Sequence, residues 1–147
     1  MKNVMIAVAI TTICVFASCS KSKKSTTPTG SMTAIANGRS FTSHDCIIVP
    51  SSRSGLNVIG YEGPRGSSRN INFGVASYTT GATGTFTITP YPDLSVTADL
   101  DSTNGGHWAD SGTITITTAS ATAVSGTFSF TTKFGDVVTN GVFTAVK

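Results

Sequence analysis

Charged side chains are scarce in this chain. Asp, Glu, Lys and Arg make up 12% of the 147 residues, about half the share of an ordinary globular protein. Four of the ten basic residues lie among the first 24 positions, which leaves six basic and seven acidic side chains for the remainder. A nucleic-acid-binding domain needs a basic surface, and this composition excludes that class of protein.

Long apolar runs are missing except at the start of the chain. Val4 to Ala17 form one such run, preceded by Lys2. A membrane span needs roughly 20 apolar residues, and this shorter run has the length and the flanks of an export signal. We therefore expect residues 1–18 to be a signal peptide that is removed from the mature protein.

The signal ends in Phe16, Ala17, Ser18 and Cys19, which resemble a bacterial lipobox. In a lipobox the cysteine thiol is acylated and the cysteine becomes the new N-terminus. Phe16 departs from the Leu, Val or Ile that is usual at its position, and cleavage by the ordinary signal peptidase is the alternative. Several acyl chains anchor a protein stably where one does not. We expect lipidation of Cys19, including palmitate, and a membrane anchor that needs no transmembrane helix.

Residues 19–30 are expected to be the lipidated cysteine and a flexible tether. The segment contains Lys, Ser, Thr, Pro and Gly and has no apolar side chain after Cys19 that could pack, as is typical of solvated linkers. Ser20 stands where an Asp marks inner-membrane retention in some bacteria, so the outer membrane is favoured. The tether lacks the acidic cluster of some surface lipoproteins, which favours the periplasmic face over the cell surface.

We expect no intrachain disulfide bond in the mature chain. Of the three cysteines, Cys14 leaves with the signal and Cys19 is acylated, so Cys46 stands alone. Residues 31–147 are enough for one domain with a single core. That core must be held by packing alone.

A short motif recurs along the domain. Gly-Thr is followed by alternating residues in GTFTIT from Gly84, GTITIT from Gly112 and GTFSFT from Gly126, with a looser copy, GVFTAV, from Gly141. A period of two places alternate side chains on one sheet face. Each copy is therefore predicted to be a strand, with Ile or Phe facing inward and Thr or Ser facing outward.

Turn signals separate these strands from others. Asn37-Gly38 predicts a type I′ hairpin, and Gly135-Asp136 is consistent with a type II′ turn. Asn140-Gly141 is either a turn or a bulge, and no segment after the signal has helical periodicity. We predict an all-β domain of about nine short strands, mainly antiparallel, folded as a β-sandwich or an up-and-down β-barrel.

The segments MTAIANGRSF, SGTITIT, VSGTFSFT and VTNGVFTAV resemble a family of small Bacteroidetes lipoproteins of unknown function. The resemblance covers residues 31–147, and Phe41 stands where Trp is commoner in that family. It implies a lipobox leader joined to one all-β domain and supplies no catalytic residues.

Three groups of residues invite a catalytic or metal site, and none is favoured. His44 and Cys46 lie too close in sequence for a Cys–His nucleophile pair, so Cys46 is expected to be a buried small side chain. A zinc site with His107 lacks the usual ligand spacing. The acidic segment from Asp99 to Asp110 matches some EF-hand offsets but has Asn104 where Gly is required, so a plain acidic loop is favoured. We expect no catalytic residue, metal or cofactor.

The strongest binding candidate is Trp108, the only tryptophan, in a Gly-rich polar segment beside His107. With Tyr61 and Tyr91 it offers a stacking surface for a sugar or a peptide, since aromatic side chains are enriched at binding surfaces. The structural alternative is a tryptophan that covers one end of the β-core.

The functional hypothesis is a lipid-anchored protein of the cell envelope that acts as a binding or scaffold module for a glycan or protein partner. The alternative is a lipocalin-like barrel that carries a small apolar ligand. An enzyme is not expected, because the few carboxylates and histidines form no paired motif. The sequence leaves the oligomeric state open.

Overall fold

The computed structural model describes residues 29–50, 55–66, 69–90, 93, 95–101 and 105–147, and these residues form an all-β domain. Its ten strands are β1 (Ser31–Ala36), β2 (Arg39–Ser43), β3 (Asp45–Ile48), β4 (Leu56–Tyr61), β5 (Asn70–Val75), β6 (Gly84–Thr87), β7 (Val96–Leu100), β8 (His107–Ala119), β9 (Ala123–Thr132) and β10 (Val137–Val146). The predicted fold class is confirmed, with ten strands in place of about nine. None of the described segments is a helix long and apolar enough to cross a bilayer.

Seven of the strands form a closed barrel. From β3 through β4, β5, β7, β8 and β9 to β10, each strand pairs antiparallel with the next. The ring closes where Val146 of β10 pairs with Ile47 of β3 in parallel orientation. An odd number of strands in an up-and-down order leaves the first and the last strand parallel, which explains the single parallel pairing.

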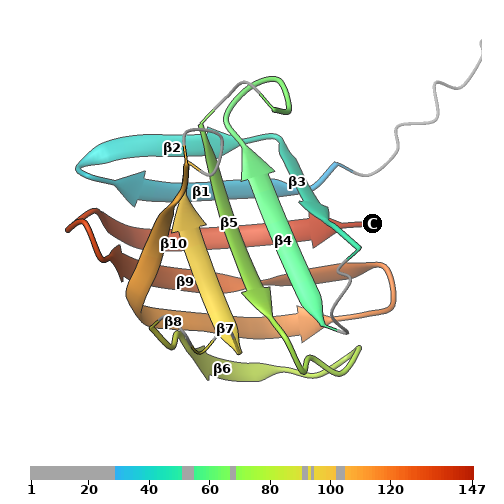
Figure 1. Cartoon of the computed structure of the whole chain (residues 1–147). Helices are drawn as coiled ribbons and strands as arrows, with labels where there is room; N and C mark the ends of the chain where they lie inside the picture. The colour runs from blue at the N-terminus through green and yellow to red at the C-terminus, as the bar shows by residue number, and fades with distance from the viewer. Residues whose placement is uncertain (1–28, 51–54, 67–68, 91–92, 94, 102–104) are drawn as a thin grey trace, which may run out of the picture.

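Three strands lie outside this ring. The β1–β2 hairpin adds to the edge of β10 through β1, and β6 adds to the edge of β8. The barrel is thereby flattened into two layers, as Figure 1 shows. A front layer of β3, β4, β5 and β7 crosses a rear layer of β2, β1, β10, β9, β8 and β6.

Strand β8 forms the corner between the layers. Its first residues pair with β7, whereas Thr113 to Ile116 pair with β6. Gly112 lies at the change of direction with a φ of 143°, and a Cβ there would come within 2.3 Å of the Ser129 carbonyl oxygen. Only glycine fits this position, and strands commonly switch sheets at such bends.

The repeated motifs have the predicted inward and outward faces. Ile114 and Ile116 of β8 are buried, and so are Phe128 and Phe130 of β9. The Thr and Ser side chains that alternate with them lie on the outer side of the rear layer, fully or partly exposed. Alternating apolar and hydroxyl side chains thus determine which side of each strand faces the core.

Phenylalanine rings fill the space between the two layers. Phe73 of the front layer lies 4.8 Å from Phe143 and 5.4 Å from Phe128 of the rear layer, measured between ring centroids. All three rings are buried in one apolar cluster that also contains Met32 and Phe41. Barrels of about eight strands have interiors just wide enough for side chains to fill. These contacts hold the two layers together, and Cys46, the one cysteine among the described residues, is free.

The turns confirm one prediction, correct another and decide a third. Asn37 and Gly38 both have positive φ, as a type I′ turn requires. The type II′ assignment at Gly135-Asp136 is wrong: the Gly135 amide bonds the Thr132 carbonyl and Thr132 pairs with Asp136, which is a three-residue loop ending in a glycine bulge. At Asn140 the β10 register shifts on both sides, so this position is a β-bulge.

Candidate binding site

Three hairpin ends meet at one end of the barrel. They are the β1–β2 turn, the start of β8 and the β9–β10 turn, and they lie on the left in Figure 1. The first described residues and the C-terminus lie at the other end, where Ser31 pairs with Thr144. The ten residues of β10 separate the two ends by about 30 Å. We call the set Asn37, His107, Trp108, Lys133, Phe134 and Asp136 the distal rim.

Asp136 connects the three hairpins of the distal rim. Its carboxylate accepts hydrogen bonds from Asn37 Nδ2 and from Thr132 Oγ1, both at 2.8 Å. His107 Nδ1 lies 2.5 Å from Asp136 Oδ2. The bonds from Asn37, Thr132 and His107 hold the pKa of Asp136 below its ordinary value because they stabilise the charged carboxylate.

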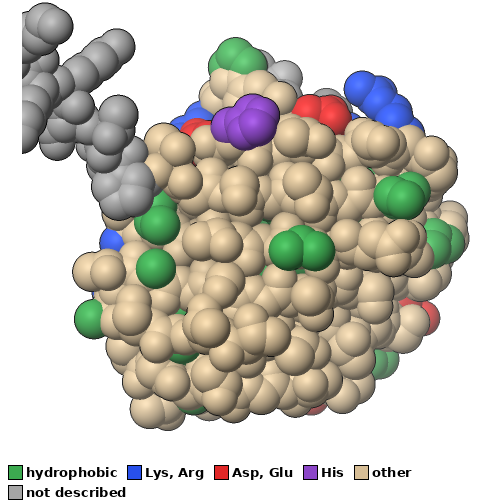
Figure 2. Space-filling view, turned by 180° about the vertical axis from the view of Figure 1, so that it is seen from behind, with side chains coloured by type: hydrophobic (Ala, Val, Ile, Leu, Met, Phe, Trp, Pro, Cys, Tyr) green, Lys and Arg blue, Asp and Glu red, His purple; other side chains and the backbone are tan. Residues whose placement is uncertain are grey.

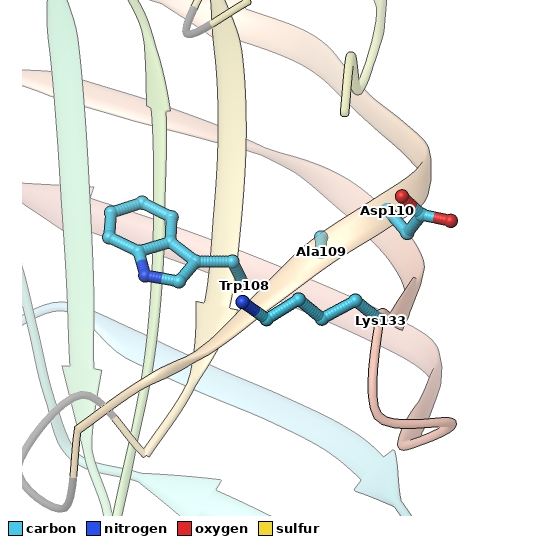
Figure 3. A pocket seen from close by; sticks show the side chains of 4 residues that line it. All are labelled: Trp108, Ala109, Asp110 and Lys133. Atoms are coloured by element: carbon cyan, nitrogen blue, oxygen red, sulfur yellow. The ribbon is translucent and has the colours of Figure 1, made fainter. Parts of the chain in front are cut away.

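Trp108 projects from β8 beside a pocket of about 360 Å³, which is lined by Trp108, Ala109, Asp110 and Lys133. Figure 3 shows the indole on one side of β8 and the Asp110 carboxylate on the other, with the Lys133 chain running along the strand between them. The indole is 45% exposed. The pocket therefore combines an aromatic surface with one positive and one negative side chain.

A second exposed aromatic residue extends this surface. Phe134 in the β9–β10 turn is 63% exposed, the highest value among the large hydrophobic side chains described. Its ring lies 4.8 Å from the His107 ring, and Lys133 Nζ lies 5.0 Å from its centroid. These contacts fix the position of Phe134 without burying it, so the ring is available to a partner.

A polar pair of which Asp99 is buried lies beside Trp108, on β5 and β7. Asn72, Asp99 and Trp108 follow one another across β5, β7 and β8 in register. Asn72 Nδ2 donates to Asp99 at 3.2 Å, and Asp99 is only 3% exposed. Burial, together with the charge of nearby Asp101, raises the pKa of Asp99 to about 6, although the Asn72 bond opposes this. The carboxyl group therefore keeps its proton to a higher pH than an exposed aspartate does.

Most of the other charged side chains that the structure describes form ion pairs around the β4–β5 loop. Glu62 lies 3.7 Å from Arg39 and 3.6 Å from Arg69, and Arg65 makes two hydrogen bonds to Asp45. Arg69 also donates to the Ala36 carbonyl oxygen. These contacts connect the loop to the β1–β2 hairpin and to β3, so we assign them a structural role.

The aromatic residues singled out from the sequence do not come together. Trp108 and His107 both belong to the distal rim, but Tyr61 lies on β4, three strands away in the front layer. Three strand spacings amount to about 14 Å, so Tyr61 and Trp108 form no joint stacking surface. Tyr91 and the lipidation site Cys19 lie outside the described residues.

The HDC segment has the geometry of a structural element. His44 is an exposed bend residue between β2 and β3, whereas Cys46 is fully buried. Burial, and to a smaller extent the charge of Asp45, raises the pKa of the Cys46 thiol to about 12, which keeps it protonated and unreactive. Within the described part of the chain, no three His, Cys, Asp or Glu side chains are placed to hold a metal ion.

Sequence reasoning missed Lys133, Phe134 and Asp136. The only local signal was the TTKFGD segment, where a phenylalanine at a turn breaks the inward pattern of β9. No protein-family model, curated protein or solved structure matches the chain. The functional argument therefore depends on the geometry of the site.

Proposed function

We propose that the protein is a lipid-anchored module of the cell envelope that binds a protein partner through its distal rim. The observation that carries the proposal is the pairing of two exposed aromatic side chains, Trp108 and Phe134, with a pocket at a hydrogen-bonded rim. Aromatic residues on a rigid support are the usual centres of binding energy in protein interfaces.

The predicted lipid anchor would determine how the distal rim is oriented relative to the bilayer. The lipobox-like segment at Cys19 and the tether that follows it precede β1, whose first residue lies at the end opposite the rim. A chain held at Cys19 would present the rim away from the bilayer. The outer membrane, with the periplasmic face preferred, remains the proposed location, and the resemblance to small Bacteroidetes lipoproteins supports the same arrangement.

Mixed charge at the rim favours a protein over a glycan as the partner at this site. Lys133 and Asp110 flank the pocket with opposite charges, and His107 with Asp136 adds a second polar pair. A protein surface offers complementary charges and apolar side chains together, and opposite charges across an interface give specificity. Binding, without catalysis, is the function we propose for this arrangement.

Photo-crosslinking in intact cells that express the full chain tests the proposal. A photoreactive amino acid replaces Phe134 in one variant and Val142, a residue of the rear layer that is also more than half exposed, in the control. We expect a discrete protein adduct from position 134 that is lost on Trp108→Ala. Adducts of equal strength at both positions, or none at position 134, would contradict the proposal.

The anchor is tested separately. Cys19→Ala should abolish metabolic labelling with a radioactive fatty acid and release the chain from the membrane fraction, because the acylated thiol is missing. A control substitution, Cys14→Ala, should leave both unchanged, since Cys14 lies inside the predicted signal. Continued labelling of the Cys19→Ala chain would refute the anchor at Cys19. It would not bear on the proposed binding role of the distal rim.

A lipocalin-like container is the second candidate, and the closed ring of seven strands favours it. The contacts of Phe73 with Phe128 and Phe143 oppose it, because they occupy the space where a ligand would lie. Mass spectrometry of the purified protein distinguishes the two candidates. A stoichiometric apolar compound that leaves only on unfolding would support the container and count against the rim.

A further inference from the structure

The rear layer carries a regular array of hydroxyl side chains on its outer side. One row crosses six hydrogen-bonded strands in exact register, from β6 through β8, β9, β10 and β1 to β2. Its members are Thr85, Thr115, Thr127, Val142, Thr33 and Thr42. All six are β-branched, and five carry a hydroxyl group.

A second row runs parallel to the first and has the same character. It consists of Thr87, Thr113, Ser129, Thr139, Ile35 and Ser40 and is offset at the bulge in β10. Neighbouring strands are about 4.8 Å apart, and side chains on one face of a strand repeat every 6.7 Å or so. The two rows together form what we call the threonine face.

None of the side chains in these two rows is charged. Figure 2 looks onto this side of the molecule, where a broad uncharged surface has its charged side chains at the margins. A surface without cations gains nothing from binding phosphate or anionic headgroups, whose recognition depends on Lys and Arg. Nucleic acids, anionic lipids and acidic polymers are therefore poor partners for this face.

The threonine face is hollowed where β8, β9 and β10 meet. A shallow groove of about 570 Å³ has a wall of hydroxyl groups from Thr113, Thr127, Ser129 and Thr139, with Asn140 and Val142 beside them. A smaller hollow of about 170 Å³ continues it and shares Ser129 and Thr139. The bulge, where Asn140 has a φ of 53°, interrupts the regular surface of β10 at this point.

We propose that the groove in the threonine face binds an uncharged polysaccharide chain. A threonine side chain offers a hydroxyl that both donates and accepts, next to a methyl group. A sugar ring likewise presents hydroxyl groups together with apolar C–H surface. A neutral polymer can dock here without leaving a charge desolvated on either side, which would cost far more than a buried hydroxyl.

The extent of the face favours a polymer over a single sugar. Ten of the twelve side chains in the two rows are Thr or Ser, and the two hollows adjoin at Ser129 and Thr139. A repeating chain makes many weak contacts at once, each worth little alone. This surface lies on the rear layer and uses none of the residues of the distal rim, so the inference stands apart from the proposed protein partner.

Calorimetric titration of the full chain, purified in detergent with its natural N-terminus, tests the inference. The probes are three neutral polysaccharides (dextran, galactomannan and a mixed-linkage β-glucan) and the acidic polymer polygalacturonate. We expect at least one neutral polymer to bind with an affinity that does not change as salt is raised. Polygalacturonate should not bind. Failure of all three neutral polymers would overturn the inference.

Substitutions in the groove locate the site. Thr127→Val keeps the shape of the side chain and removes its hydroxyl, and Asn140→Gly removes the amide while tolerating the positive φ. Each should weaken binding about fivefold, the equivalent of one net hydrogen bond, and Val142→Glu should abolish it. Thr97→Val, the same change on β7 of the front layer, is the matched control that should leave the affinity unchanged. An affinity insensitive to all the groove variants would overturn the inference.

A second copy of the chain is the competing occupant of this face. Sedimentation velocity of the same preparation distinguishes the two, because a self-interface makes the sedimentation coefficient depend on protein concentration. A dimer that Val142→Glu dissociates would assign the threonine face to self-association and overturn the polysaccharide inference. A monomer at all concentrations, together with binding of a neutral polymer, would support it.

Discussion

The distal rim and the threonine face are assembled in opposite ways. On the threonine face, backbone hydrogen bonds between adjacent strands place every side chain, and one row across six strands consists of five threonines and one valine. At the rim, side-chain hydrogen bonds join residues as distant in sequence as Asn37 and Asp136. The face is a periodic surface without charge, whereas the rim is a single constellation of aromatic and charged groups.

This difference determines how each surface responds to substitution. At the rim, Asp136 alone accepts side-chain hydrogen bonds from both the β1–β2 hairpin and its own turn. On the face the interactions are distributed over many similar side chains, most of them solvated. Single substitutions should therefore lower the free energy of unfolding more at the rim than on the face. A substitution in the core, which lies beneath both surfaces, should lower it most of all.

The largest loss of stability is expected on the inner side of β8, in the core that supports both surfaces. Ile116→Asp should prevent folding, with a loss of at least about 4 kcal/mol, because it places an unpaired carboxylate in the apolar core. Thr117→Asp is the matched control on the adjacent outward side chain and should leave a cooperative transition. Circular dichroism during thermal unfolding measures both. An unchanged transition in Ile116→Asp would mean that the two sides of β8 are reversed.

The alternation of side chains made the threonine face predictable in part. Ile114, Ile116, Phe128 and Phe130 were assigned to the core from a period of two alone, and all four are buried. The rows across strands were not predictable, because they depend on which strands are neighbours and in what register. The choice between barrel and sandwich was left open for the same reason: it depends on one pairing, Val146 with Ile47.

The distal rim was much less accessible to sequence reasoning. Trp108 and His107 were singled out as aromatic and polar residues in a Gly-rich segment, but their neighbours come from a turn more than 20 residues away in sequence. The glycine at 135 was recognised as a turn residue and its turn type was misassigned. Glycine suits both a type II′ turn and a bulge loop, so the local sequence could not distinguish them. Because the position of Phe134 depends on the turn type, it could not be predicted either.

The charge buried next to the rim should give the protein a characteristic pH dependence. Because the pKa of Asp99 is raised to about 6 from 3.8, the folded state binds a proton more tightly than the unfolded state. Stability is therefore greatest below pH 4 for this group and falls as pH rises through 6, by about 3 kcal/mol in total. Urea unfolding at several pH values measures the fall.

Replacing the carboxyl group should remove this dependence. Asp99→Asn should abolish the fall between pH 4 and 6, whereas Asp110→Asn, an exposed residue on the neighbouring strand, should retain it. The uncharged threonine face contributes no titration, so the pH dependence would be confined to the front layer and the rim. A fall that persists in Asp99→Asn would assign it to another group.

Loss of the Asp136 carboxylate should weaken the contacts among the three hairpins of the rim, which backbone hydrogen bonds from Asn37 to Val137 and from Lys133 to Trp108 also join. Asp136→Ala should lower the free energy of unfolding at pH 7 by about 2 kcal/mol, the typical value for hydrogen bonds to a charged group. The pKa of Asp136 is lowered in the folded state, so its stabilisation is present above the unfolded pKa of 3.8 and is lost as pH falls through the folded value. Wild type and variant should therefore converge in acid, and a constant difference down to acid would show that the carboxylate charge is not responsible.

The smallest effect is expected on the threonine face. Thr127→Val replaces a solvated hydroxyl with a methyl group at an exposed position of β9, where valine has an equal preference for strands. The free energy of unfolding should change by no more than about 0.5 kcal/mol, as is usual for surface substitutions, even though the same variant is expected to weaken polysaccharide binding. Urea unfolding of the variant beside Asp136→Ala measures the contrast directly. A loss of unfolding free energy on Thr127→Val comparable to that on Asp136→Ala would mean that the hydroxyl rows stabilise the sheet. The two surfaces would then not differ in how their side chains contribute to stability.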